Sequence, residues 1–503
     1  MRRAGSRAKR GHVRRERLIV NPRKKKLAIV GNGMGTDRLL DELARRDATQ
    51  RFEITVFGEE RGGAYNRIML GKVLSGASPD AIVTKTPEWY DANGVRLIQS
   101  TRVTRLDTLR KQVQTADGQS RRYHVAILAT GSQPLVPPLE GMRGEDGELR
   151  SGVFVYRTVA DCIRMRGYAR SGDGAVVVGG GLLGLEAAKA LSDMGLHVTV
   201  VQSSKILMNA QLDDLAGEML GRQIERAGIF TRLGRTVESI HGDERVTGVL
   251  LDDGTPLSTD MVVLACGVRP RIDAARASGL PVNRGIVVND TLATEVPGVY
   301  AFGECAEHRG RNYGIVTPVW EQAAVLADVL TGANPQERYR GSKLYTRLKV
   351  AGVDVASMGV LQPELERDEV IQIVEERRDC YRKLIVRDGK LVGAMLVGNT
   401  GATATLVQLF DRGDPVPSDP LELLCTLRAA PSPAERVVCN CNKVSEQGVC
   451  EAIDAGADSI EALGVQTRAG TGCGSCKGEL AQLLAKHAKP AHSLPLLATA
   501  ATG

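Results

Sequence analysis

The pattern of apolar and polar positions along the chain predicts two copies of one local unit. Residues 27–30 form a short apolar run, a glycine-rich turn follows, and residues 34–43 carry apolar side chains at helical spacing. A second strand is expected over residues 52–57, and the same order of strand, glycine turn, helix and strand returns between residues 175 and 201. Because a parallel strand–helix–strand unit with a glycine turn is typical of dinucleotide binding, we expect one such domain to interrupt another.

The C-terminal third of the chain has a different pattern of apolar and polar residues. Short alternating apolar runs and the Asp388-Gly389 turn predict a hairpin-rich sheet between residues 340 and 410. Residues 411–436 are rich in Pro, Asp and Ser, which predicts a linker. A compact module with paired cysteines follows, to about residue 488.

Composition changes this picture mainly at the N-terminus. The chain of 503 residues has a net charge of +7, but residues 1–26 carry +11 by themselves, so the rest is mildly acidic. This tail is predicted to be a disordered extension, or the product of a start codon placed too far upstream; a basic arm for an acidic partner or a membrane is the alternative. It lacks the apolar core of a signal peptide.

Several classes of function are disfavoured by composition. No uninterrupted apolar run reaches the roughly 18 residues of a membrane span, and aromatic residues, at 4%, are too scarce for a platform that stacks single-stranded nucleic acid. We therefore expect neither a membrane nor a nucleic-acid partner. Ten cysteines without a secretory signal favour a reducing cytoplasm over a disulfide scaffold.

The first glycine loop, residues 31–36, reads Gly-Asn-Gly-Met-Gly-Thr. Gly31 permits the tight turn, and Gly33 lets backbone N–H groups approach a pyrophosphate at the helix N-terminus. Thr36 stands where Gly or Ala is usual, so we expect looser packing of helix on strand. Glu59 or Glu60, after the next strand, can accept hydrogen bonds from a ribose.

The second loop matches the full dinucleotide fingerprint, with glycines at 179, 181 and 184. The strand after it ends at Gln202, where an acidic residue would favour NAD. Residues 202–205 contain no carboxylate that would repel a 2′-phosphate, so the sequence leaves both NADH and NADPH open.

Two further segments fit a flavin. Ala129-Thr130-Gly131 closes a predicted strand that starts at Tyr123, and the apolar run from Val299 ends in Gly303-Glu304. A carboxylate at the end of such a strand can accept a hydrogen bond from a ribityl hydroxyl. The order of these segments with the two glycine loops indicates FAD and NAD(P)H as cofactors.

Four cysteines are paired near the C-terminus. Cys439-x-Cys441 is followed, after 31 residues, by Cys473-x-x-Cys476. Structural zinc more often has two to four residues between paired cysteines, and zinc cannot accept the single electrons that a flavin reductase delivers. The quartet is therefore predicted to ligate a [2Fe-2S] cluster, with zinc as the alternative.

With these motifs, residues 27–480 resemble the flavin- and cluster-bearing front half of the large subunit of bacterial NAD(P)H nitrite reductase. They equally resemble the related electron-transfer subunit of assimilatory nitrate reductase. The landmarks that carry the resemblance are residues 29–34, 64–67, 155–158, 179–186, 267–270, 303–305 and the cysteine quartet.

The resemblance implies roles for particular residues. Arg67 and Lys72 would lie by the flavin, Glu186 would lie beside the nicotinamide, and a catalytic Lys72–Glu186 pair would hold charge near the flavin N5. The predicted cofactor-binding residues are Gly31, Gly33, Met34, Glu59, Glu60, Arg67, Lys72, Ala129, Thr130, Gly131, Gly179, Gly181, Leu182, Leu183, Gly184, Glu186, Gln202, Gly267, Gly303 and Glu304.

The resemblance also implies the fold. We expect an α/β flavoprotein with two dinucleotide-binding domains, similar to glutathione reductase, a small α+β domain and a small helical [2Fe-2S] domain. The expected division is a basic disordered tail at 1–26, an FAD-binding domain at 27–160 and 271–335, an NAD(P)-binding domain at 161–270, an α+β domain at 340–410, a linker at 411–436, a [2Fe-2S]-binding domain at 437–488 and a frayed tail at 489–503.

Two absent patterns refine the expected activity. The first helix carries no Cys-x4-Cys redox disulfide, which argues against a thiol–disulfide reductase. The chain also lacks the Cys-x5-Cys and Cys-x3-Cys set that holds the sirohaem-linked cluster of nitrite reductases, so we do not expect it to reduce nitrite itself.

The expected route runs from NAD(P)H to FAD, then to the cluster and on to a separate terminal reductase. A molybdenum nitrate reductase is the favoured partner, and the catalytic subunit of a split sirohaem nitrite reductase is the alternative. A reductase for a rubredoxin, ferredoxin or oxygenase, and a module that senses NAD(P)H without turnover, also stay open. The sequence leaves the oligomeric state open as well.

Overall fold

The structure, a computed structural model, describes residues 24–425 and 436–487, apart from positions 171, 351, 440, 441, 473 and 475. The predicted basic tail up to residue 23, the frayed tail at 489–503 and part of the predicted linker, residues 426–435, lie outside the described residues. Cys441 and Cys473 lie outside them too.

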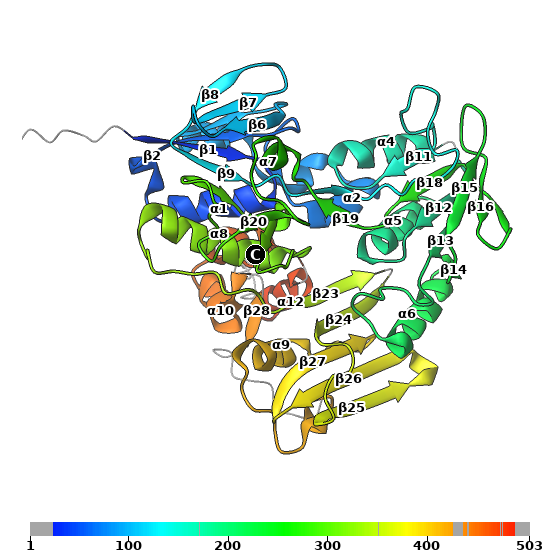
Figure 1. The fold of residues 1–503 in the computed structure, drawn as a ribbon. Helices are drawn as coiled ribbons and strands as arrows, with labels where there is room; N and C mark the ends of the chain where they lie inside the picture. Colours follow the sequence, from blue (N-terminus) through cyan, green and yellow to red (C-terminus); the bar gives the residue numbers. More distant parts are fainter. Residues whose placement is uncertain are drawn as a thin grey trace, which may run out of the picture.

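The first lobe is built on a five-stranded parallel sheet in the order β21-β9-β1-β2-β5. The first strand begins at Lys25, two residues before its predicted start, and runs KKLAIV with its last four residues buried. Helix α1 follows after the glycine loop at residues 31–33, and its buried residues Leu39, Leu40 and Leu43 pack beside helix α8 (Figure 1). The strands and helices of this lobe are β1 (Lys25–Val30), α1 (Met34–Ala44), β2 (Phe52–Phe57), β3 (Ala64–Tyr65), α2 (Leu70–Leu74), β4 (Val83–Lys85), α3 (Pro87–Ala92), β5 (Val95–Ile98), β6 (Val103–Asp107), β7 (Gln112–Thr115), β8 (Ser120–Arg122), β9 (Val125–Leu128), β10 (Ser132–Pro134), α7 (Asp273–Ala277), β20 (Ile286–Val288), β21 (Val299–Ala301), β22 (Ala306–His308) and α8 (Val316–Thr331).

The second lobe repeats this plan. Its parallel sheet has the order β11-β18-β12-β13-β14, so the strand with the glycine loop is again central and is again flanked by the strand that follows it. The elements of this lobe are β11 (Val153–Val155), α4 (Val159–Ala169), β12 (Gly174–Val178), α5 (Leu182–Asp193), β13 (His197–Gln202), α6 (Asp214–Arg226), β14 (Phe230–Leu233), β15 (Val237–His241), β16 (Gly248–Leu251), β17 (Pro256–Ser258), β18 (Met261–Leu264) and β19 (Val268–Pro270).

The third lobe is an antiparallel sheet of five strands, as the alternating pattern predicts. Its order is β23-β24-β27-β26-β25, and the Asp388-Gly389 turn joins two neighbouring strands. Helix α9 covers one face. The elements are β23 (Tyr345–Val350), β24 (Val353–Gly359), β25 (Asp368–Glu375), β26 (Cys380–Arg387), β27 (Lys390–Val397) and α9 (Thr403–Arg412).

The structure corrects the predicted start of the linker. A short 3-10 helix at Pro420–Leu423 follows α9, and the side chains of Leu423 and Leu424 are buried in the core of the third lobe. These two apolar residues overcome the polar composition around them, so the chain up to Cys425 belongs to the third lobe.

The cysteine module has a small core of its own. Its elements are β28 (Val437–Cys439), β29 (Val444–Ser445), α10 (Glu446–Asp454), α11 (Ile460–Thr467) and α12 (Lys477–His487). The module lies between the first lobe and the antiparallel sheet (Figure 1). Within the described part of the chain, no helix has the length and apolar content needed to cross a bilayer.

Candidate functional site

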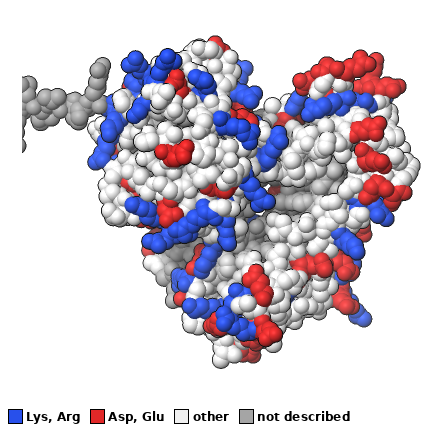
Figure 2. Space-filling view, viewed as in Figure 1, with Lys and Arg blue, Asp and Glu red and all other residues white. Residues whose placement is uncertain are grey.

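A cavity of about 990 Å³ opens where the three lobes and the cysteine module meet. Figure 2 shows the recess between the lobes, with Lys and Arg side chains along its left margin. The predicted residues that line the cavity are Gly31, Gly33, Met34, Glu59, Glu60, Arg67, Lys72, Ala129, Thr130, Gly131, Leu182, Leu183, Glu186, Gly303 and Glu304. The predicted residues outside its lining are Gly179, Gly181, Gly184, Gln202 and Gly267.

The first glycine loop is shaped by close backbone contacts and by open space. Gly31 has φ of +109°, and a Cβ there would lie 2.2 Å from the carbonyl oxygen of Ala129, so only glycine fits. A Cβ at Gly33 would meet nothing within 4 Å. Gly33 is therefore not required by packing within the protein, and the space in front of it suits an approaching pyrophosphate.

The second loop repeats both features. Gly179 has φ of +115°, and a Cβ there would lie 2.4 Å from the carbonyl oxygen of Ala265, while Gly181 again faces open space. The third glycine is required more strictly, since a Cβ at Gly184 would lie 1.9 Å from the carbonyl oxygen of Gly179. Both loops therefore fit a dinucleotide at the N-terminus of the following helix.

Thr36 occupies the corresponding third position in the first loop. Its side chain is buried, and its hydroxyl donates a 2.7 Å hydrogen bond to the carbonyl oxygen of Gly31. The side chain fills the space between loop and helix, so the structure does not show the looser packing that we expected.

The two acids proposed for a ribose lie at the cavity and are both paired. Glu59 pairs with Arg271, and Glu60 pairs with Arg67 and accepts a 2.7 Å hydrogen bond from the hydroxyl of Tyr65. The guanidinium of Arg67 lies over the ring of Tyr65, 4.8 Å from its centroid. These contacts orient Glu60 and leave its remaining lone pairs for a ligand.

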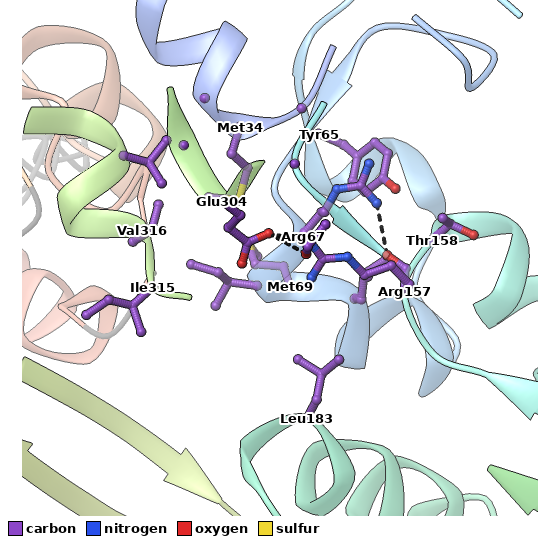
Figure 3. Close-up of a pocket in the computed structure, with 18 of the residues that line it drawn as sticks. Met34, Tyr65, Arg67, Met69, Arg157, Thr158, Leu183, Glu304, Ile315 and Val316 are labelled. Carbon is purple, nitrogen blue, oxygen red and sulfur yellow. Dashed lines mark hydrogen bonds and ion pairs between the residues drawn. The ribbon is translucent and has the colours of Figure 1, made fainter. Parts of the chain in front are cut away.

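Glu304, which also lines the cavity, is held by two donors. Its carboxylate lies 2.5 Å from Nη2 of Arg157 and accepts a 2.8 Å hydrogen bond from the hydroxyl of Ser132 (Figure 3). Arg67 in turn donates to the backbone carbonyl of Arg157 at 2.9 Å. The Nε atom of Arg157 is buried and has no hydrogen-bond partner in the part of the chain that the structure describes, which fits a site with a further polar occupant.

Arg157, Ser132 and Tyr65 were not among the predicted site residues. The segment around Arg157 is one of the landmarks of the resemblance, which was the only signal for it. Ser132 follows Gly131 directly, so its position next to a predicted loop could have indicated it.

Glu186, on helix α5, has an unusual electrostatic environment. Burial raises the pKa of its carboxyl from 4.5 to about 7. The pKa of Tyr156 is also raised, first by burial and then by the charge of Glu186, and the Tyr156 hydroxyl has no hydrogen-bond partner among the described residues. A carboxyl in such a setting can exist in both protonation states near neutral pH.

Lys72 and Glu186, which the resemblance places together near the flavin N5, form no direct ion pair in the described part of the chain. Both residues are described and both line the cavity, but Lys72 is exposed, and Glu186 has no ion-pair partner in the described part of the chain. Lys72 lies on a helix of only five residues. Burial is the single cause of the raised pKa of Glu186, which agrees with the lack of a charged partner among the described residues.

The side chain of Gln202 binds the second glycine loop and does not line the cavity. Its side-chain carbonyl accepts a 2.7 Å hydrogen bond from the backbone N–H of Gly180, and its amide donates to Asn209 at 3.1 Å. The amide is thus committed to the loop, and it places no negative charge at the strand end where an acid would bind a ribose.

Two of the four predicted cluster ligands are described. Cys439 and Cys476 are both buried in the core of the cysteine module. The side-chain amide of Asn442 donates toward the sulfur of Cys439 at 3.7 Å, a contact that suits a thiolate. Gly474 and Lys477, next to the predicted ligands, line the same cavity as the first glycine loop.

Comparisons with known proteins agree with this arrangement. Residues 345–413 match the rubredoxin NAD+ reductase C-terminal domain, and residues 437–486 match the BFD-like [2Fe-2S] binding domain. The structure is similar to NADH:rubredoxin oxidoreductase from Clostridium acetobutylicum, with a TM-score of 0.63 and 23% identity over 80% of this chain and 99% of that chain.

Two curated relatives from Bacillus subtilis (strain 168) extend over almost the whole chain. The nitrite reductase [NAD(P)H] is 38% identical over 472 residues, which cover 92% of this chain and 57% of the relative. The assimilatory nitrate reductase electron transfer subunit is 35% identical over 480 residues, which cover 93% and 61%. The chain therefore spans less than two thirds of the length of either relative.

These matches confirm the predicted fold class, the oxidoreductase class and the predicted cofactors: a flavin, a nicotinamide nucleotide and a [2Fe-2S] cluster. Residues 25–325, more than half of the chain, match the pyridine nucleotide-disulphide oxidoreductase family. By that match, the chain belongs to the pyridine nucleotide-disulphide oxidoreductase family.

Proposed function

We propose that this protein takes electrons from NAD(P)H and delivers them, through its cysteine module, to a separate molybdenum nitrate reductase. One observation carries the proposal: residues next to the cluster ligands, Gly474 and Lys477, line the same cavity as the first glycine loop. The cavity and the cluster site are thus neighbours. When bound, the flavin would accept hydride from the nicotinamide and pass single electrons to the cluster.

The residues of the chain hold and orient the cofactors in this proposal. The two glycine loops would bind pyrophosphates, Glu60 and Glu304 would accept hydrogen bonds from hydroxyl groups, and the cysteine quartet would ligate the cluster. Glu186 would lie beside the nicotinamide. Because the pKa of its carboxyl is raised to about 7, it could bind or release a proton near neutral pH. Lys72, at the cavity, would supply a positive charge near the flavin ring.

The nitrate reductase partner is supported by the electron transfer subunit among the relatives. The 38% identity to a nitrite reductase supports a second candidate, the reductase subunit of a split sirohaem nitrite reductase. We also propose a cytoplasmic location, which the free thiols of the six cysteines outside the quartet support.

An anaerobic titration with NADH or NADPH tests the proposal. We expect bleaching of the flavin followed by the EPR signal of a reduced [2Fe-2S] centre. In a Cys473→Ser variant, reduction of the partner should be lost while reduction of a dye is retained. If dye reduction collapsed equally in a folded variant, the proposed order of carriers would be wrong.

Reconstitution with purified partners separates the two candidates. A nitrate reductase that turns over with NAD(P)H only when this protein is present would support the first candidate. Turnover with a sirohaem protein, and none with the nitrate reductase, would replace the first candidate by the second.

A further inference from the structure

An ion pair joins the cysteine module to helix α1 of the first lobe. Arg468 follows helix α11, and its Nη2 lies 2.5 Å from Oδ2 of Asp41 on helix α1. The two side chains are 24% and 22% exposed, so water screens the pair only in part. The partners are 427 positions apart in sequence, and the pair therefore joins separate units of the fold.

A hydrogen bond beside this pair reaches the predicted cluster site. Arg38, also on α1, donates from Nη1 to the side-chain oxygen of Asn442 at 2.9 Å. The amide nitrogen of Asn442 donates to the carbonyl oxygen of Arg468 at 2.7 Å and toward the sulfur of Cys439 at 3.7 Å. Asn442 thus connects helix α1 with both the ion pair and a cluster ligand.

The first lobe presents these groups in a fixed geometry. Asp41 is also bound by Lys85 at 2.9 Å, and Lys85 itself is buried and lies over the ring of Trp89. Arg38 lies over the ring of Trp320, 5.6 Å from its centroid. Because neighbouring groups already restrain both partners on α1, little conformational entropy is lost when the module binds them.

A third contact lies next to the predicted ligand Cys473. The buried side chain of Asn66 donates to the backbone carbonyl of Gly472, and its oxygen accepts from the backbone N–H of Ile68 at 3.1 Å. Residue 66 precedes the segment that carries Arg67 and Lys72 at the cavity. The same short stretch therefore contacts the cavity on one side and the cysteine module on the other.

We propose that the Arg468–Asp41 ion pair and the Arg38–Asn442 hydrogen bond form a docking contact that holds the cluster next to the flavin cavity. Its four members are positioning residues, because they act on the distance between the two centres and not on the chemistry of either. The inference rests on the proposed function, since docking matters only if electrons pass from cavity to cluster. Each transfer moves one electron, and no bond is made or broken.

The charges and the partial exposure of the contact predict how strong it is and how it responds to salt. A charge-assisted hydrogen bond of this kind is worth more than a neutral one, and it weakens as salt increases. Removing Arg468 should therefore raise the undocked population about tenfold. High salt should shift the wild-type protein in the same direction.

Hydrogen exchange on the full chain with its cofactors bound tests the docking directly. In an Arg468→Gln variant, we expect exchange over residues 34–44 and 66–74 to become faster, by up to about tenfold. Lys486→Gln is a matched control, because it removes one positive charge from an exposed position of the same module. Its exchange should equal that of the wild type.

Stopped-flow absorbance gives a second readout. The rate of cluster reduction after the flavin is reduced should fall about tenfold in Arg468→Gln, while flavin reduction by NAD(P)H keeps its rate. Asp41→Asn should reproduce both effects, and the double variant should be little worse than either single one, because the partners are coupled. Arg468→Lys keeps the positive charge, so it should retain part of the docking. It serves as a control in case Arg468→Gln fails to fold.

Wild-type exchange in both Arg468→Gln and Asp41→Asn would overturn the docking contact. Faster exchange with an unchanged rate of cluster reduction would show that the contact does not position the cluster, which also overturns the inference. If the cluster of the wild-type protein were never reduced by NAD(P)H, the proposed function would fail, and the exchange data would still decide whether the module docks.

Discussion

Glu186 shows how a single residue can carry information about the site. Its carboxyl lines the cavity, no described residue forms an ion pair with it, and burial alone raises its pKa to about 7. Below pH 4.5 the carboxyl is protonated in the folded and in the unfolded chain. Between that pH and about 7 only the unfolded chain ionises, so stability falls as pH rises and then levels off.

The first prediction follows from this fall in stability with rising pH. Without bound nucleotide or flavin, the free energy of unfolding should drop by on the order of 2 kcal/mol between pH 5 and pH 7.5 through Glu186. Glu186→Gln should remove this part of the pH dependence, measured by urea denaturation at several pH values. Glu238→Gln, at an exposed position of the same lobe, should keep the wild-type slope. An unchanged slope in Glu186→Gln would contradict the assignment.

Arg157 supports a second prediction at the same scale. It is the ion-pair partner of Glu304, so Arg157→Gln would leave that carboxylate partly buried without its counter-charge. The lost charge-assisted bonds are worth roughly 1.5–3 kcal/mol, and we expect FAD to bind at least about tenfold more weakly. Fluorescence titration of the apoprotein with FAD measures this. Arg122→Gln, on exposed strand β8, should bind FAD like the wild type.

At the scale of single elements, the important features are the two glycine loops and the helix N-termini that follow them. Both loops were predictable, because each is a continuous motif: Gly31 and Gly179 adopt positive φ, and a Cβ at Gly184 would meet Gly179 of the same loop. The role of Thr36 was not predictable, since its hydrogen bond to Gly31 depends on a side-chain position that the pattern does not specify. The absence of the Lys72–Glu186 pair has the same cause: it depends on the distance between two helices from different lobes.

Gly184 provides the third prediction. Because a Cβ there would lie 1.9 Å from the carbonyl oxygen of Gly179, Gly184→Ala must displace the loop from the helix. We expect the KM for NAD(P)H to rise more than tenfold and Tm to fall. Gly221→Ala, in the middle of α6 where a Cβ meets nothing within 4 Å, is the matched control. It should stabilise the protein by about 0.5–1 kcal/mol and leave the KM unchanged. Equal effects of the two substitutions would contradict the geometry.

At the scale of the whole molecule, the sequence predicts the lobes but not how they meet. Strand and helix patterns are local, and they predicted both parallel sheets and the hairpin sheet. The contacts between lobes join residues such as Asp213 and Lys383, 170 positions apart, and no local pattern marks either one. Leu423 and Leu424 were assigned to a linker for a related reason, because composition averages over the two residues that reach a core.

The junction of the second and third lobes supports the last prediction. Nζ of Lys383, on β26, lies 2.9 Å from Oδ2 of Asp213, and each side chain is only 5% exposed. Asp213 also accepts a 2.8 Å hydrogen bond from the hydroxyl of Tyr381 and a 3.0 Å hydrogen bond from the backbone N–H of Ala216, in the first turn of α6. One carboxylate therefore fixes the start of a helix of the second lobe and two side chains of the third.

Lys383→Met would leave that carboxylate buried without a counter-charge, which typically costs about 3 kcal/mol or more. Urea denaturation should show this loss, whereas Lys390→Met, at an exposed position of the same sheet, should lie close to the wild type. Adding Asp213→Asn to Lys383→Met should recover part of the stability, because the uncompensated charge is then gone. A loss no larger than that of the control would mean that water reaches Asp213, and that apolar packing, rather than this ion pair, joins the two lobes.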